Sequence, residues 1–255
     1  MTNELILVTG SSGRIGRAVA GELQRRGRRV RGFDLVATPN LTEMATGTLT
    51  DPAAVAKAMR GVHTLIHLAA TPDDDDFLKQ IVPNNIIGVH HVLEAAQEAG
   101  VKRMILASSG QVVWYDRLRT STPLGVDAAP TPRYWYAAAK MFLEGAGRAF
   151  AEKFGMDVIA VRLGWCPRTP EQVEEIRVTD WARDVYLSPN DAGRFFACAA
   201  EAPGPLGFQV VYATSKPVHW MRYDLEPTKR LLGFEPHEQW PQGIEIVLGK
   251  NEPRA

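Results

Sequence analysis

The chain has 255 residues, 45% of them hydrophobic, and its 29 Lys and Arg residues balance its 29 Asp and Glu residues. This composition supports one large domain, or one domain with a small appendage. The neutral charge predicts no nucleic-acid or anionic-membrane partner, and no apolar run approaches the ~20 residues of a membrane span. We see no signal-peptide pattern and expect a cytoplasmic protein.

Strand-like and helix-like segments alternate along the first two thirds of the chain. Short apolar runs predict buried strands at residues 5–10, 29–35, 63–70, 103–109 and 157–164. Amphipathic spacing with start and stop residues predicts helices at residues 14–26, 53–59, 84–100 and 136–155. This alternation predicts an α/β fold, a Rossmann-like doubly wound parallel sheet covered on both faces.

The pattern changes after Cys166, because the next 20 or so residues show little periodicity. A helix at 191–200, a strand at 208–213 and a Pro-rich tail follow. We therefore predict a dinucleotide-binding domain at 1–166 and a small C-terminal substrate cap at 167–255, whose late elements return to the main sheet. The two cysteines and six histidines show no metal-ligand spacing, so we expect no metal.

Gly10, Gly13 and Gly16 stand between the first predicted strand and the first predicted helix. A tight strand-to-helix turn needs the backbone freedom of glycine. A pyrophosphate needs the same turn without side chains in the way, and it binds the N–H groups at a helix start. In the first strand–helix–strand unit, this pattern indicates a dinucleotide site at the helix that begins near Arg14.

Asp34 ends the second predicted strand, where a carboxylate binds the adenosine ribose hydroxyls of a dinucleotide. Because this carboxylate accepts a free 2′-hydroxyl and repels a 2′-phosphate, we predict NAD as the cofactor. Arg14, Arg31 and the pair Arg28-Arg29 could counter the repulsion, which leaves NADP open. The alternative for these arginines is a solvated basic face.

Tyr136 and Lys140 lie four residues apart and so share one face of a predicted helix. Tyrosine is a poor base at neutral pH, with an ordinary pKa of ~10. A lysine ammonium and the positive nicotinamide ring would favour the phenolate. Ser108 and Ser109 end a parallel strand, where open α/β sheets bind ligands, so either could hold the substrate oxygen. We assign Tyr136, Lys140 and Ser109 as the catalytic residues.

The motifs "TGSSGRIG", Asp34, "HLAA", "NNIIG", "ASSG" and "YAAAK" occur in this order. Over residues 4–165 the chain resembles the extended short-chain dehydrogenase/reductase superfamily, the NAD-dependent epimerase/dehydratase group. One departure is Thr48-Leu49, where many members have Asp-Leu and an adenine contact. The resemblance implies a cofactor site made of Gly10, Ser12, Gly13, Arg14, Ile15, Gly16, Asp34, Leu49, Leu68, Ala69, Ala70, Asn85, Ala107, Tyr136, Lys140 and Cys166.

Within this group the chain is similar to uronate dehydrogenases, which oxidise the anomeric hydroxyl of a hexuronate with NAD. Arg177 would then bind the sugar carboxylate, the alternative being a loop arginine in solvent. Gly110-Gln111 replaces Asn-His, and Trp165 replaces a serine, so the uronate substrate does not carry over securely. The implied substrate site consists of Ser108, Ser109, Gly110, Gln111, Trp165 and Arg177.

Four consecutive aspartates, at residues 73–76, precede the helix that contains "NNIIG". We interpret them as charge at a helix N-terminus, where carboxylates interact favourably with the helix dipole. The alternative is a lip of the substrate pocket. A carboxylate that faces the pocket would disfavour an acidic substrate.

We predict a NAD-dependent oxidoreductase that transfers a hydride between nicotinamide and the hydroxyl or carbonyl group of a sugar-like substrate. A uronate is among the candidate substrates. One alternative is a nucleotide-sugar epimerase or dehydratase, although Gly110-Gln111 lacks the acidic pair typical of such dehydratases. A second is a non-catalytic NAD(P) sensor, a class that often loses the tyrosine or lysine present here. The resemblance also implies a homodimer formed through the "NNIIG" and Tyr136 helices.

Overall fold

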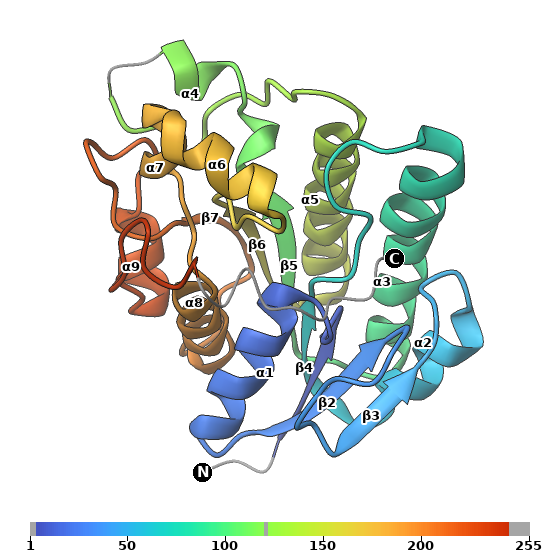
Figure 1. The fold of residues 1–255 in the computed structure, drawn as a ribbon. Helices are drawn as coiled ribbons and strands as arrows, with labels where there is room; N and C mark the ends of the chain where they lie inside the picture. Colours follow the sequence, from blue (N-terminus) through green and yellow to red (C-terminus); the bar gives the residue numbers. More distant parts are fainter. Residues whose placement is uncertain (1–3, 120–121, 245–255) are drawn as a thin grey trace.

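The computed structural model describes residues 4–119 and 122–244. In this part of the chain, parallel strands form one sheet in the order β3-β2-β1-β4-β5-β6-β7 (Figure 1). The strand order changes direction between β1 and β4, and open α/β sheets bind ligands beyond the carboxyl ends of their strands at this point. The strands are β1 (Leu5–Thr9), β2 (Arg29–Asp34), β3 (Glu43–Thr46), β4 (Val62–His67), β5 (Arg103–Ser109), β6 (Asp157–Leu163) and β7 (Phe208–Ala213).

The central strands are buried on both faces, which explains their continuous apolar sequences. Every residue of β1 is buried. Leu7 packs into a core on one face of the sheet, and Ile6 packs into a second core on the other. The alternation of side chains along a strand therefore feeds two cores from one short segment.

Helices cover both faces of the sheet (Figure 1). On the first face, α2 (Pro52–Met59), α3 (Gly88–Glu98) and α5 (Trp135–Phe154) contribute to the core that contains Leu7. On the second face, α1 (Arg14–Arg25), α8 (Pro189–Glu201) and α9 (Glu226–Leu232) contribute to the core that contains Ile6. These two layers of helices confirm the predicted Rossmann-like fold.

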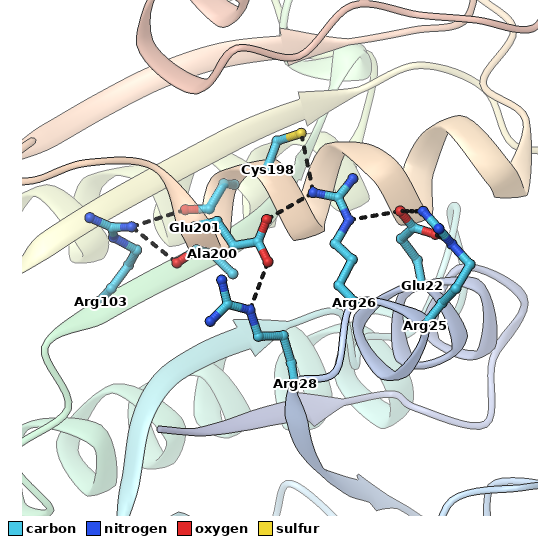
Figure 2. Close-up of polar contacts among 9 residues, drawn as sticks. Glu22, Arg25, Arg26, Arg28, Arg103, Cys198, Ala200 and Glu201 are labelled. Carbon is cyan, nitrogen blue, oxygen red and sulfur yellow. Dashed lines mark hydrogen bonds and ion pairs between the residues drawn. The ribbon is translucent and has the colours of Figure 1, made fainter. Parts of the chain in front are cut away.

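Helix α8 packs closely against α1, although the two are far apart in sequence. A Cβ at Gly193 would lie 2.8 Å from the carbonyl oxygen of Ala18, so glycine permits this approach. Glu201 accepts hydrogen bonds from Arg26 at 2.8 Å and Arg28 at 2.7 Å (Figure 2). Thus β7 belongs to the main sheet and α8 to the helical layer on it, although both follow the predicted boundary at Cys166. The division into a dinucleotide-binding domain and a substrate cap stays a prediction.

The segment after β6 contains more helix than its weak periodicity predicted. It forms α6 (Pro170–Val178) and α7 (Asp180–Asp184), which lie with α4 (Asp116–Arg119) beyond the same end of the sheet (Figure 1). The Thr169 side chain accepts a hydrogen bond from Gln172 N, and Pro170 occupies the first turn. These two features are ordinary helix-start signals, so α6 begins with capping residues although the segment shows little periodicity.

The helix predicted at 84–100 begins earlier than expected. Residues Phe77–Ile87 form the π-helical segment η1, which continues directly into α3. A short 3-10 turn, η2 (Gly110–Val112), follows β5. No helix in the described ranges is long and apolar enough to cross a membrane.

Candidate active site

The turn between β1 and α1 is built from glycines that larger residues would disrupt. Gly10 has a φ of +70°, and a Cβ there would lie 2.7 Å from the Ala69 nitrogen. A Cβ at Gly16 would lie 2.7 Å from the Cα of Ser11. Gly13 caps α1 and brings no side chain over the helix N-terminus. The first N–H groups of α1 are therefore suited to a pyrophosphate, and the turn fits a dinucleotide.

Asp34 lies beside this turn, at the end of β2. Its Oδ2 accepts a hydrogen bond from Ser12 N at 2.8 Å, and its Oδ1 accepts one from Leu35 N at 2.7 Å. The Ser12 hydroxyl donates to the Val36 carbonyl, and Ile15 packs against the core. Ser12 and Ile15 thus shape the turn, while Asp34 stands where the ribose-binding carboxylate was predicted.

The arginines that could favour a 2′-phosphate are engaged elsewhere. Arg31 pairs with Glu43 at 2.6 Å, and Arg29 pairs with the same carboxylate at 3.1 Å. Arg28 pairs with Glu201 across the contact with α8. Because these partners occupy the three guanidinium groups, the structure favours NAD over NADP.

Arg14 binds the segment that follows β6. Its guanidinium donates to the backbone carbonyl of Pro167, and Nη2 donates to that of Arg168 at 2.6 Å. Arg14 is 7% exposed. The sequence predicted Arg14 at the cofactor site, with a 2′-phosphate as one possible partner. In the structure, its side chain joins the start of α1 to the loop after Cys166.

The loop after β4 passes beside the glycine turn. Leu68 N donates to the Thr9 carbonyl at 3.2 Å, which directs residues 68–70 past Gly10. Asn85 binds both backbone groups of Thr71, accepting from its nitrogen at 2.8 Å and donating to its carbonyl at 2.9 Å. Asn85 therefore positions the loop of predicted cofactor residues Leu68, Ala69 and Ala70. Buried Leu49 packs against the start of α3 at Gly88.

Ser109, Tyr136 and Lys140 meet at the end of β5. The Ser109 hydroxyl hydrogen-bonds the Tyr136 phenol, and Gln111 N donates to Ser109 Oγ at 3.1 Å. Lys140 Nζ lies 5.5 Å from the centroid of the Tyr136 ring and donates to the carbonyl of Ala107 at 2.7 Å. Tyr136 and Lys140 occupy adjacent turns of α5, as the sequence spacing predicted.

The environment of the site sets two pKa values. Burial lowers the pKa of Lys140 to about 8. Burial and the carboxylate of Asp73 raise the pKa of Tyr136 above its usual value, whereas Arg168 and the Ser109 hydroxyl act to lower it. Arg168 and Ser109 therefore act to lower the Tyr136 pKa. The sequence led us to expect this lowering effect from Lys140.

Ser108 faces away from this group of side chains. Its hydroxyl donates to Glu144 Oε1 at 2.6 Å, and the same oxygen accepts from Arg162 Nε at 3.0 Å. Ser108, Glu144 and Arg162 are all buried. Ser108 is thus part of a buried polar network with α5, and Ser109 is the serine that lies beside Tyr136.

Two further predicted substrate residues have structural partners. A Cβ at Gly110 would lie 3.0 Å from the ring of Tyr223, so glycine allows Tyr223 to cover this turn. The Trp165 ring stacks on Trp181 at 6.1 Å between centroids, and Trp165 N donates to Val185 at 2.7 Å. Cys166 follows, half-buried. These contacts anchor the loop that borders the site.

Arg177 does not reach the site. Its side chain is 64% exposed and pairs with Glu174, one turn earlier on α6, at 2.6 Å. The alternative stated for Arg177, a surface arginine in solvent, is what the structure shows. The arginine that does lie near Tyr136 is Arg168, two residues before the start of α6.

Four polar residues meet around Asp73, and we call them the Asp73 cluster: Asp73, Gln111, Arg168 and Gln172. Of these, only Gln111 and, as an alternative, the run at 73–76 were predicted at the substrate pocket. Asp73 Oδ2 pairs with Arg168 and accepts from Gln172 Nε2 at 3.1 Å, and Oδ1 accepts from Gln111 Nε2 at 3.4 Å. The cluster joins the loops after β4, β5 and β6. Such a contact across three loops leaves no periodic signal in the sequence.

The helix-charge interpretation of residues 73–76 is right for part of the run. Asp76 accepts a hydrogen bond from Lys79 N at 2.9 Å and so caps η1. Asp74 accepts from Tyr136 N at 3.0 Å, in the first turn of α5. Asp73 does not cap a helix, because its carboxylate faces Gln111 and Arg168 beside Tyr136, which agrees with the alternative stated for this run.

Comparison with known families assigns the chain. The family described as "NAD dependent epimerase/dehydratase family" matches residues 6–179. The chain belongs to this family. The predictions of NAD as cofactor and of an NAD-dependent enzyme are confirmed by this assignment and by the relatives below.

Among the curated relatives of this family member is an L-arabinose 1-dehydrogenase (NAD(P)(+)) from Haloferax volcanii. It is 28% identical and covers 94% of this chain and 99% of its own length. A uronate dehydrogenase from Agrobacterium fabrum is 31% identical and covers 72% of this chain and 69% of its own length. The names of these two relatives give a neutral sugar for one and an acidic sugar for the other.

Solved structures agree with the fold of the family. A uronate dehydrogenase from Agrobacterium tumefaciens superimposes with a TM-score of 0.77 at 26% identity, over 99% of this chain and 91% of its own. A glucuronic acid dehydrogenase from Chromohalobacter salexigens gives a TM-score of 0.79 at 25% identity, over the same shares of the two chains. The resemblance to uronate dehydrogenases is thereby confirmed.

Proposed function

We propose that this chain is a dehydrogenase that oxidises a hydroxyl group of a small sugar-like molecule with NAD, or reduces the corresponding carbonyl. The observation that carries the proposal is the meeting of Ser109, Tyr136 and Lys140 at the end of β5, beside the glycine turn. The L-arabinose and uronate dehydrogenases among the relatives support a sugar-like substrate.

Tyr136 is the general base in this proposal. Its deprotonated form, the phenolate, accepts the proton of the substrate hydroxyl, and Ser109 donates a hydrogen bond that holds the substrate oxygen beside Tyr136. When bound, NAD supplies the nicotinamide ring that takes the hydride from the substrate carbon. Lys140, whose pKa burial lowers to about 8, holds a proton close to the phenol and offers its ammonium to the nicotinamide ribose. In the reverse direction, Tyr136 returns the proton as the general acid.

The cofactor would lie across the glycine turn. The N–H groups at the start of α1 bind the pyrophosphate, and the Asp34 carboxylate binds the adenosine ribose hydroxyls. The predicted contacts of Leu49, Ala107 and Cys166 belong to the same proposal. Asn85 holds the loop of residues 68–70 in place, through Thr71.

The direct test is to incubate the protein with NAD and a panel of aldoses, uronates and polyols while following the absorbance of reduced nicotinamide. Tyr136→Phe should lower kcat by about 10²–10⁴-fold, because it removes the general base. The matched control is Tyr134→Phe, since this residue is 58% exposed and lies two positions before Tyr136. If no substrate reduces NAD, and the two variants behave alike, the dehydrogenase proposal is wrong.

The panel also separates the other function classes. A nucleotide-sugar epimerase would produce an epimer without net reduction of NAD, and a non-catalytic sensor would bind NAD and turn over nothing. We retain a cytoplasmic homodimer within the proposal. Light scattering should then give about twice the chain mass of 28.1 kDa, and a monomer mass would contradict the dimer.

A further inference from the structure

We propose that Asp73 makes this site selective for neutral sugars over their uronate counterparts, by neutralising Arg168 and by presenting a carboxylate to the bound sugar. The inference rests on the proposed function and adds the substrate class and the residue that selects it. No uronate-binding role remains for Arg177, which pairs with Glu174 on the surface.

Asp73 lies beside the reacting group of Tyr136. Its negative charge acts on the Tyr136 phenol, as does the positive charge of Arg168. Gln111, which binds Asp73, donates its backbone N–H to Ser109. The Asp73 cluster therefore borders the place where the substrate oxygen lies between Ser109 and Tyr136.

Arg168 is the cation next to the expected position of the substrate oxygen. Its guanidinium pairs with Asp73 Oδ2, and Gln172 bonds both residues. Gln172 Nε2 donates to Asp73 at 3.1 Å, while Gln172 Oε1 accepts from Arg168 N at 2.7 Å. A substrate carboxylate would have to displace Asp73 from Arg168 and would meet its negative charge. Like charges placed together in this way disfavour a ligand.

The other carboxylate oxygen of Asp73, Oδ1, does not pair with Arg168. A carboxylate has about four acceptor positions, and the long 3.4 Å contact from Gln111 lies on Oδ1. The Asp73 side chain is 44% exposed, so its carboxylate is open to a ligand. A neutral sugar offers hydroxyl donors to such an oxygen, whereas a carboxylate at the same position offers none. The cluster thus attracts a hydroxyl and repels a carboxylate at one place.

The backbone holds Asp73 in this orientation. Its φ is +58°, in the left-handed region that residues other than Gly, Asn and Asp seldom adopt. The turn after Pro72 therefore directs the carboxylate toward Arg168, while Asp74 and Asp76 bind helix N-termini. Asparagine tolerates the same φ, so Asp73→Asn removes the charge without changing the turn.

The test compares D-galactose with D-galacturonate, which differ at C6 alone. For the wild-type enzyme, kcat/KM with NAD should favour the neutral sugar by about tenfold or more. In Asp73→Asn, the ratio should move toward the uronate by at least about tenfold, because Arg168 loses its internal partner. Asp75→Asn is the matched control, since Asp75 is exposed in the same run and its Oδ1 accepts from Asp76 N.

A pH profile gives a second readout that loss of structure would not produce. Because Asp73 raises the pKa of Tyr136, Asp73→Asn should move the Tyr136-dependent limb of kcat to lower pH. Asp75→Asn should leave that limb in place. A wild-type preference for the uronate, or an unchanged ratio in Asp73→Asn, would overturn the inference.

A binding measurement separates this inference from the proposed function. Tryptophan fluorescence of the NAD complex of Tyr136→Phe reports the two dissociation constants without turnover. If wild type fails to reduce NAD but the neutral sugar binds tighter, and Asp73→Asn reverses that order, the dehydrogenase proposal is wrong and the Asp73 inference stands. If neither sugar binds, both are wrong.

Discussion

Arg14, the first residue of α1, donates a hydrogen bond to the backbone carbonyl of Arg168 at 2.6 Å, across 154 residues of sequence. This bond connects the two halves of the candidate site. Arg14 starts the helix that would bind the pyrophosphate, and Arg168 forms the ion pair with Asp73 next to Tyr136. The cofactor turn and the substrate loop therefore share one anchoring side chain.

We expect Arg14→Met to raise KM for the sugar about 5–20-fold, because a buried charged hydrogen bond worth roughly 1.5–3 kcal/mol would be lost from the loop at residues 167–168. The ratio of NAD to NADP affinity should stay within about twofold of wild type. Steady-state kinetics with both cofactors measures the two effects. A selective loss of NADP binding would instead show that Arg14 contacts a 2′-phosphate.

Asp34 should determine the choice between NAD and NADP. We expect Asp34→Ala to weaken NAD binding and to reduce the preference for NAD over NADP by about tenfold or more, because it removes both the ribose acceptor and the negative charge. Calorimetric titration of each cofactor gives the two affinities. An unchanged preference would place the discriminating group elsewhere, with Arg31 and Arg29 the first residues to test.

The glycines of α1 offer a matched pair of substitutions within one helix. Gly16→Ala should destabilise the fold by about 1–3 kcal/mol and abolish NAD binding, because its Cβ would lie 2.7 Å from the Cα of Ser11. Gly21→Ala should raise the free energy of unfolding by about 0.5–1 kcal/mol, because its Cβ meets no atom within 4 Å. Urea unfolding measures both. Equal effects at the two positions would contradict the close packing of the turn.

His67 should make the protein sensitive to acid. Burial and the nearby Lys140 lower its pKa to about 3, from 6.5 in the unfolded chain. Because the folded-state pKa is the lower one, the unfolded state binds more protons as the pH falls from 6.5 toward 3, and stability is lost over this window. His67→Gln should lose less stability than wild type between pH 6.5 and 4.5, by roughly 2 kcal/mol.

Urea unfolding at a series of pH values measures this difference. His67 also bonds Thr9 through its ring, at 2.8 Å, so the variant is expected to be less stable at pH 7. The prediction therefore concerns the slope with pH and not the value at one pH. His63→Gln, on the same strand but 37% exposed, is the control and should keep the wild-type slope. Parallel curves for wild type and His67→Gln would remove His67 as the cause.

Local sequence was sufficient for the parts of the site that depend on backbone geometry and helical spacing. The glycine turn, Asp34 at the end of β2, and Tyr136 with Lys140 on one face of α5 were all predicted from short patterns. Each is fixed by interactions within one strand–helix unit or one helix. The same reasoning assigned Ser109 as catalytic but kept both Ser108 and Ser109 in the predicted substrate site. It could not show that Ser108 bonds Glu144, in a helix 36 residues later.

The sequence by itself therefore determined the fold class, the glycine turn between β1 and α1, and the placing of Tyr136 and Lys140 on one helix face, since alternating periodicity and i to i+4 spacing are local properties. The tertiary structure alone decided the substrate side of the site. Arg177 turned out to be a surface residue, and Asp73, Gln111 and Arg168 came together from three loops at the carboxyl ends of β4, β5 and β6. These loops meet because the parallel strands end at one edge of the sheet, and no pattern along the chain specifies which of their side chains make contact.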